Sequence, residues 1–278
     1  MPHENHGPRR ATRTSYVYAR SWLLVAAHNR DGMNTGFSSH ADAVILDLED
    51  GVLSADKPAA RSAVARRLRS GFTAWVRIND ADSEYWSADL DEIACLPGLA
   101  GLVLAKAERG SQIDVTAARL PEAIPIIALI ESAAGLEAAS EIANHPRVAR
   151  LAFGSGDYRR DTGVSADPLA MAYPRSRLTV VSRAAGLPGP IGGPTLPGNT
   201  DALESETRSA TAVGMTGRLC LRAEHTGPIN RLLSPSPTEI DWAKGLLGQA
   251  GQKNGLDGSY RPQVARAARV LELAEIYA

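Results

Sequence analysis

Short apolar runs alternate with amphipathic stretches from the beginning of the chain to about residue 225. The apolar runs, each of a length suited to a buried strand, are residues 22–25, 43–46, 74–78, 101–104, 124–130, 151–153, 190–191 (a weak one) and 219–221. Between them, helical spacing predicts helices over residues 56–68, 86–95, 111–120, 136–143, 168–185 and 200–213. No Gly-x-Gly-x-x-Gly follows the first strand. The pattern therefore predicts a closed α/β (β/α)8 TIM barrel in preference to a doubly wound open sheet.

The pattern changes after Leu233. Residues 234–237 read Ser-Pro-Ser-Pro, which ends one element and starts another. Either Ser236 or Thr238 is a suitable cap for a helix that begins near Glu239, and Ser111 is a suitable cap for the helix over 111–120. Apolar residues at helical spacing predict a final helix over residues 261–277.

The order of the predicted elements divides the chain into three parts. They are a flexible N-terminal tail (residues 1–15), the barrel (16–233) and a C-terminal helical extension (234–278). An amphipathic terminal helix has to bury its apolar side, either on its own barrel or on a neighbouring subunit. We therefore expect a homo-oligomer.

Composition and charge narrow the classes of partner. The formal net charge is −1, with 44% hydrophobic and 22% charged residues, which argues against binding to nucleic acid or to a membrane surface. No apolar run is long enough for a membrane span, and the polar N-terminus does not resemble a signal peptide. Cys95 and Cys220 lack metal or redox spacing, and we expect two reduced, buried thiols. A cytoplasmic protein that binds a small molecule fits these features best.

The chemistry-bearing residues lie where the predicted strands end. Functional groups of a TIM barrel occupy that edge. Reading along it gives the set Asp47, Glu49, Asp50, Arg77, Asn79, Lys106, Glu131 and Asp157. Buried charges are costly unless they are paired or bind a metal. Several carboxylates together with Arg77 and Lys106 therefore predict a metal site beside an anionic substrate, and Glu131 with Asp157 would suit a hard divalent cation.

Each of these residues also has a simpler interpretation. Glu131 and Asp157 would interact favourably with helix N-termini even without a metal. Arg77 would be satisfied by an ion pair with Asp47 or Glu49, and Lys106 suits a structural ion pair better than a Schiff base. His28 is the one histidine that follows a predicted strand, so it is a weaker candidate for the site.

Five motifs together resemble a known family. They are residues 41–50 (ADAVILDLED) followed by Lys57, 76–79 (VRIN), 129–132 (LIES) followed by Gly135, 153–157 (FGSGD), and 234–237 (SPSP) with Trp242. In this combination they are similar to the citrate lyase β-subunit-like family, which belongs to the wider group of Mg-dependent HpcH/HpaI aldolases and acyl-CoA lyases. The resemblance runs from about Ser21 to Ala274.

The resemblance implies a function and a role for each site residue. It implies a lyase that cleaves or forms a carbon–carbon bond in a carboxylated 3-hydroxyacyl-CoA thioester, such as a citramalyl- or malyl-like one, through an enolate. Glu131 and Asp157 would bind Mg²⁺, and Arg77, with Glu131 beside it, would bind the substrate. Asp47 and Glu49 would support catalysis by orienting Arg77 or the metal's water ligands. A trimer is the assembly that the resemblance favours.

Three segments depart from the family pattern. Residues 26–29 read Ala-Ala-His-Asn where members usually have Pro-Gly, and 221–223 read Leu-Arg-Ala where they usually have Ile-His-Pro. Residues 257–262 read Asp-Gly-Ser-Tyr-Arg-Pro, without the second Asp that many acyl-CoA lyases carry in this segment. Two other functions therefore stay open: a metal-dependent aldolase acting on a free 2-oxo acid, and a non-catalytic protein that binds metal and ligand.

Overall fold

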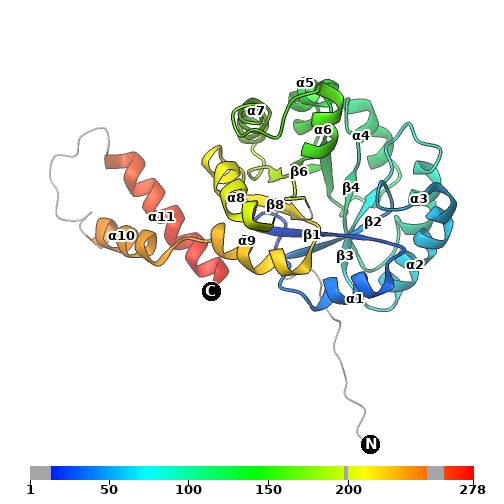
Figure 1. The fold of residues 1–278 in the computed structure, drawn as a ribbon, viewed down its shortest axis with the longest axis horizontal. Helices are drawn as coiled ribbons and strands as arrows, with labels where there is room; N and C mark the ends of the chain where they lie inside the picture. Colours follow the sequence, from blue (N-terminus) through cyan, green and yellow to red (C-terminus); the bar gives the residue numbers. More distant parts are fainter. Residues whose placement is uncertain (1–13, 197–199, 249–259) are drawn as a thin grey trace, which may run out of the picture. The chain divides into compact units, whose positions relative to one another are not determined.

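Eight parallel strands within the described part of the first 229 residues form a closed barrel (Figure 1). A computed structural model describes residues 14–196, 200–248 and 260–278. The strands are β1 (Ser21–Ala26), β2 (Ala43–Asp47), β3 (Ala74–Ile78), β4 (Leu99–Leu104), β5 (Ile126–Ile130), β6 (Val148–Phe153), β7 (Ile191–Gly192) and β8 (Gly217–Cys220). Each strand pairs with the next along the chain, and β8 pairs with β1. The predicted (β/α)8 barrel is confirmed.

Helices enclose the strands. In the barrel they are α1 (Arg30–Ser38), α2 (Lys57–Arg69), α3 (Trp86–Ile93), α4 (Gly110–Ala117), α5 (Ala133–Ala143), α6 (Ser155–Thr162), α7 (Ala172–Ala184), α8 (Leu203–Ala212) and α9 (Thr226–Leu232), with short 3₁₀ turns at Ser54–Asp56, Thr200–Ala202 and Ala223–His225. The cap prediction for Ser111 was wrong. The backbone N–H groups of Glu108 and Arg109 donate to the Gln112 side chain, so α4 begins at Gly110, and Ser111 lies inside its first turn.

Large apolar side chains fill the barrel interior. Trp22 and Trp75 are fully buried and meet edge to face, with ring centroids 5.3 Å apart. Gly101 makes room for the second indole, because a Cβ at this position would lie 2.2 Å from a ring carbon of Trp75. Of the two cysteines, Cys220 is buried as expected, whereas Cys95 is exposed and corrects the expectation of two buried thiols. Both are free thiols.

The remaining residues form a second compact unit, whose boundary falls between Ile229 and Asn230. It contains α10 (Pro237–Gly248) and α11 (Tyr260–Tyr277), so the predicted C-terminal helical extension is confirmed. Ser236 caps α10. Its hydroxyl accepts from the backbone N–H of Glu239, and the Glu239 carboxylate accepts in return from the Ser236 N–H, as in a capping box.

Some sequence predictions fall outside the described part of the chain. They concern the N-terminal tail up to residue 13 and the segment 257–259. Within the described residues, the structure contains no helix whose length and apolar character would let it cross a bilayer.

Candidate active site

The predicted site residues come together at the carboxyl end of the barrel strands. The parallel register places Asp47, the last residue of β2, beside Arg77 of β3. It also pairs Ile130 of β5 with Phe153 of β6, so that Glu131 and Gly154 follow side by side. The strand pairing therefore explains why residues far apart in the sequence meet at this edge.

Arg77 and Asp47 form a buried bidentate ion pair. Arg77 Nε donates to Asp47 Oδ1 at 2.7 Å, and Nη2 donates to Oδ2 at 2.8 Å. Burial opposes ionisation of Asp47, but the charge and hydrogen bonds of Arg77, with the backbone N–H groups of Glu49 and Gly51, hold its pKa below the usual range. Asp47 therefore stays ionised and fixes the plane of the guanidinium.

Arg77 retains donors beyond this pair. Its Nη1 lies 3.0 Å from Glu49 Oε2, but this oxygen has no aligned hydrogen bond within the described residues. A guanidinium has five N–H donors, of which Asp47 takes two. The ion pairs considered in the sequence analysis are therefore present, and they leave Arg77 able to bind a further oxygen.

Glu49 is shared between Arg77 and Lys106. Lys106 Nζ donates to Glu49 Oε1 at 2.6 Å, as expected for a structural ion pair. Lys106 is also the one non-glycine residue in the described chain with a left-handed backbone, at φ 46°. Such a conformation costs about 1–2 kcal/mol for an L-residue. This strain points to a functional constraint on the β4–α4 loop.

Glu131 is a buried carboxyl group whose pKa is raised, in contrast to that of Asp47. It is 3% exposed, and its Oε1 accepts from the backbone N–H of Lys106 at 2.8 Å. Burial, with the neighbouring charges of Glu49 and Asp157, raises its pKa to about 8, although Arg77 opposes the shift. Two further carboxylates thus surround Glu131, and the charge of this cluster favours a cation.

Asp157 lies in the first turn of α6, two residues beyond the sharp turn that follows β6. Its Oδ1 is 2.7 Å from Arg160 Nη2 on the same helix. Asp157 and Glu131 line one cavity of about 390 Å³, together with Lys106, Glu108, Ser132, Arg160 and Asp161. Asp157 therefore does lie at a helix N-terminus, where its negative charge is favourable, as the simpler interpretation of the sequence expected. Glu131, in contrast, precedes Ser132, which caps α5.

The donor set fits a magnesium ion. Mg²⁺ prefers oxygen ligands, keeps several waters and commonly takes only one or two protein carboxylates. Glu131 and Asp157 supply two carboxylates to one cavity. The described residues contain no cluster of three or more His, Cys, Asp and Glu side chains suited to a metal, so any site here would be one of two carboxylates and water.

A buried network behind Glu49 was only partly visible in the sequence. All three N–H donors of Lys57 are used: they reach the carbonyls of Leu48 and Glu49 and the side chain of Asn79. Asn79 in turn donates to Asp89, which is fully buried in α3. This network fixes the backbone that carries Glu49. The one sequence feature that could have indicated this network was Asp89, a charged residue on the apolar side of a predicted helix.

His28 lies apart from this cluster. It is exposed, and it lines a groove between α1 and α2 with Met33, Ala60 and Arg67.

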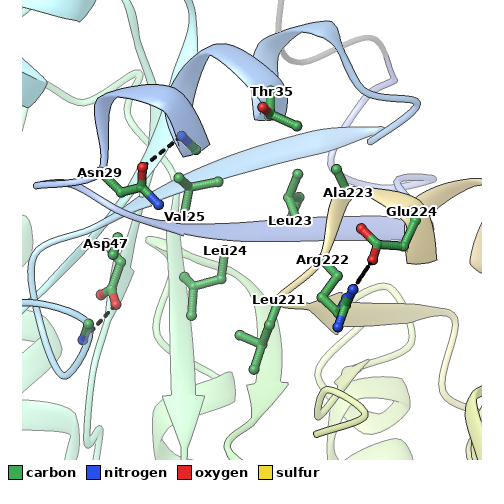
Figure 2. A pocket seen from close by; sticks show the side chains of 14 residues that line it. Leu23, Leu24, Val25, Asn29, Thr35, Asp47, Leu221, Arg222, Ala223 and Glu224 are labelled. Carbon is green, nitrogen blue, oxygen red and sulfur yellow. Dashed lines mark hydrogen bonds and ion pairs between the residues drawn. The ribbon is translucent and has the colours of Figure 1, made fainter. Parts of the chain in front are cut away.

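Two of the three sequence departures line one pocket. This pocket, of about 460 Å³, lies between α1, β1 and the residues after β8. Figure 2 shows Asn29 and Asp47 towards one end of it, and Arg222 and Glu224 towards the other. Residues 26–29 and 221–223 are distant in sequence, but they meet because β8 closes the barrel against β1. The third departure, at Asp257, is not among the described residues.

This chain is similar to known proteins both in sequence and in structure. The family model described as HpcH/HpaI aldolase/citrate lyase matches residues 20–223, and the HpcH/HpaI aldolase C-terminal domain matches residues 238–278. Among curated relatives, a (3S)-malyl-CoA thioesterase from Cereibacter sphaeroides is 29% identical over 81% of this chain and 80% of its own. A citrate lyase subunit beta-like protein from Mycobacterium tuberculosis is 29% identical over 84% of this chain and 86% of its own.

Solved structures share the same fold. A crystal structure of protein CitE from Mycobacterium tuberculosis, in complex with magnesium, acetoacetate and coenzyme A, has a TM-score of 0.79. The two chains are 27% identical, and the match covers 93% of this chain and 99% of that one.

Proposed function

Because this chain belongs to the HpcH/HpaI aldolase/citrate lyase family, we propose that it is a Mg²⁺-dependent enzyme that acts on a small carboxylated CoA thioester. Similar proteins carry names that refer to malyl-CoA and to citrate lyase, and a similar structure contains magnesium and coenzyme A. The observation that carries the proposal is the pair of carboxylates, Glu131 and Asp157, in one cavity.

These two residues would hold the metal. When bound, Mg²⁺ supplies a Lewis acid that polarises a carbonyl and stabilises the negative charge of an enolate. The three N–H donors of Arg77 that Asp47 does not use would bind the carboxylate or carbonyl oxygen of the substrate. Asp47 holds the guanidinium in place for this task, and Glu49 together with Lys106 positions its Nη1 side.

We favour carbon–carbon cleavage as the reaction. The 3-hydroxyl group loses its proton while the C2–C3 bond breaks, so that C3 becomes the carbonyl carbon of an oxo acid. The bonding electrons stay on C2 as a thioester enolate, and protonation of C2 then gives the shorter acyl-CoA. Arg77 would support this step, because a fixed positive charge stabilises the negative charge that develops beside it.

Thioester hydrolysis is the second candidate, because one relative carries the name (3S)-malyl-CoA thioesterase. Water would then add to the thioester and release free CoA and the hydroxy diacid, with the carbon chain intact. Both reactions would use the same metal ligands and the same contact of Arg77 with the substrate carboxylate, and their products differ.

The altered pocket beside Asp47 suggests a different substrate preference from that of typical members. Its wall combines Asn29 with Leu221 and Arg222, all of which lie in the segments that depart from the family pattern. A side chain that faces the substrate changes which acyl group is accepted. We therefore expect the preferred thioester to differ from those of typical members in its acyl portion.

The test is to incubate the protein with Mg²⁺ and malyl- and citramalyl-type CoA thioesters, and to identify the products by mass spectrometry. A shorter acyl-CoA together with an oxo acid supports cleavage, whereas free CoA with an intact diacid supports hydrolysis. The matching free acids are run in parallel, and turnover of these alone would indicate the free-acid aldolase. Binding of a thioester without any product would indicate the non-catalytic protein and contradict the proposal.

Matched variants connect the activity to the metal ligands. We expect Glu131→Gln and Asp157→Asn to weaken Mg²⁺ binding in calorimetry and to abolish turnover. Asp161→Asn is the control, because Asp161 lies on the same helix and accepts from the backbone N–H of Ala133, which an amide oxygen can replace. Unchanged Mg²⁺ affinity in both ligand variants would contradict the assignment.

A further inference from the structure

A second cavity, of about 310 Å³, lies on the other side of helix α6 from the carboxylate cavity. Ser155, Gly156 and Arg159 line it, whereas Asp157 and Arg160 of the same helix line the carboxylate cavity. The two cavities share no lining residue. The second one is therefore separate from the site proposed above.

The lining of this cavity carries excess positive charge. Arg159 from α6, Arg175 from α7 and Arg218 from β8 all line it, and Glu206 is the one carboxylate among its described lining residues. Three guanidinium groups and a single carboxylate leave two positive charges without a counter-charge. This is the opposite of the carboxylate cavity, where four acidic residues line the wall with Lys106 and one arginine.

Arg218 is the deepest of these groups. It is 2% exposed, and its Nη2 donates to Thr195 Oγ1 at 2.8 Å and to Glu206 Oε2 at 2.7 Å. Its Nε and Nη1 have no hydrogen-bond partner among the described residues. A buried donor left without a partner costs free energy, and more so when it is charged. The site is therefore incomplete as a set of side chains alone.

Arg159 and Arg175 have unmet donors too. Nε of each is buried without a partner in the described part of the chain. Arg175 makes one long contact, from Nη1 to Ser209 Oγ at 3.5 Å. Burial lowers the pKa of Arg218 to about 10, and the positive charge of Arg175 adds to this, whereas Glu206 opposes it. One carboxylate thus does not neutralise the cluster.

We propose that this cavity binds a small dianion that carries a phosphate or dicarboxylate group. Guanidinium groups offer paired N–H donors that match the oxygens of both groups, and two excess positive charges match a dianion. Helix α6 also begins here without a side-chain cap, because its N-cap is Gly154, and a helix N-terminus favours negative charge. Met171 and Pro194 supply an apolar wall for a carbon portion.

The test measures binding of inorganic phosphate and of malonate by calorimetry, in buffer free of divalent cations. We expect saturable binding to the wild-type protein and at least about tenfold weaker binding to Arg175→Gln, since a hydrogen bond to a charged group contributes about 1.5–3 kcal/mol. Arg159→Gln should act in the same direction. Arg183→Gln is the matched control, because Arg183 is exposed on the same helix as Arg175 and does not line the cavity.

Every outcome of the calorimetry either supports or overturns the proposed anion site. The anion that binds more tightly, phosphate or malonate, identifies the class of ligand. Saturable binding of either anion supports the site. Absence of saturable binding by either anion would overturn it, as would affinities that Arg175→Gln and Arg159→Gln leave unchanged. Glu131→Gln should bind the anion as the wild type does, so failure of the magnesium site and failure of this one are distinguishable. Arg218 is left intact because its burial makes a folding defect the expected result of replacing it.

Discussion

At the scale of single residues, Asp47 and Glu131 are both buried carboxyl groups at the ends of barrel strands, but their protonation differs. Asp47 has two hydrogen bonds from Arg77, and these outweigh the effect of burial and lower its pKa. Glu131 receives a backbone N–H bond and has Glu49 and Asp157 as charged neighbours, so burial dominates and its pKa rises to about 8. The raised pKa thus favours the protonated form of Glu131 at neutral pH in the metal-free protein.

This difference predicts how the stability of the metal-free protein depends on pH. Between the ordinary pKa of 4.5 and the folded value of about 8, the folded chain keeps a proton on Glu131 that the unfolded chain releases. Raising the pH through this window therefore favours unfolding. We expect a loss of up to about 4 kcal/mol, since one pKa unit corresponds to about 1.4 kcal/mol.

Urea denaturation at several pH values between 5 and 8 measures this slope in the presence of a chelator. In Glu131→Gln the corresponding part of the slope should be absent, and Mg²⁺ should restore the stability of the wild type at pH 8. Parallel pH profiles of the wild type and the variant would show that Glu131 is already ionised in the folded protein.

The sequence predicted which residues gather at the site and named Asp47 or Glu49 as the partner of Arg77, but not that Arg77 contacts both. Parallel strands bring their carboxyl ends to one edge, so Arg77, Glu131 and Asp157 could be placed there from the strand pattern alone. The division of Arg77 between Asp47 and Glu49 depends on strand register and side-chain angles, which no sequence pattern specifies. The left-handed backbone of Lys106 was likewise invisible, because lysine has no preference for it.

At the scale of elements, the turn from β6 into α6 controls the space around Glu131. A Cβ added at Gly154 would lie 2.3 Å from Glu131 Oε2 and 2.5 Å from its Cβ. We expect Gly154→Ala to displace the Glu131 side chain and to weaken Mg²⁺ binding at least about tenfold, which corresponds to about 1.4 kcal/mol. Calorimetric titration with Mg²⁺ measures the change.

Gly156→Ala is the matched control two residues further on. Apart from the adjacent residues and the backbone of α6 itself, no atom lies within 4 Å of a Cβ at Gly156, and alanine favours a helix over glycine by about 1 kcal/mol. This variant should bind Mg²⁺ as the wild type does, with equal or higher thermal stability. If Gly154→Ala and Gly156→Ala bind Mg²⁺ with the same affinity, the missing side chain at Gly154 is not what leaves space for Glu131.

The strands were predictable because each is a short apolar run, whereas three helices, α1, α6 and α9, were not predicted. Helix α6 buries one side chain, Tyr158, so its sequence carries no apolar period. Helix α1 contains two glycines and is stabilised by the Asn29 cap, whose side chain accepts from the Gly32 N–H at 2.8 Å. The helix expected over 168–185 begins later, at Ala172. Apolar periodicity alone therefore does not identify these helices or their first residues.

At the scale of the whole molecule, the barrel and the C-terminal unit differ in how much they bury. All eight strands contribute side chains to the apolar interior of the barrel, which includes the fully buried Trp22 and Trp75. Among the described residues of α10 and α11, Ala243 and Ala267 are the only ones that are buried. Two helices with so little buried apolar area do not form an independent domain.

The C-terminal unit therefore needs a partner surface, and we expect it in a homo-oligomer, with a trimer favoured. Light scattering coupled to size-exclusion chromatography should give a mass above that of the 29.4 kDa chain. Removal of residues 234–278 should lower the mass to that of a monomer if a neighbouring subunit supplies the surface. The shortened barrel should keep its circular dichroism spectrum, because its core lies within the first unit. A monomeric full-length protein would contradict the expected assembly and place the partner surface on the chain's own barrel.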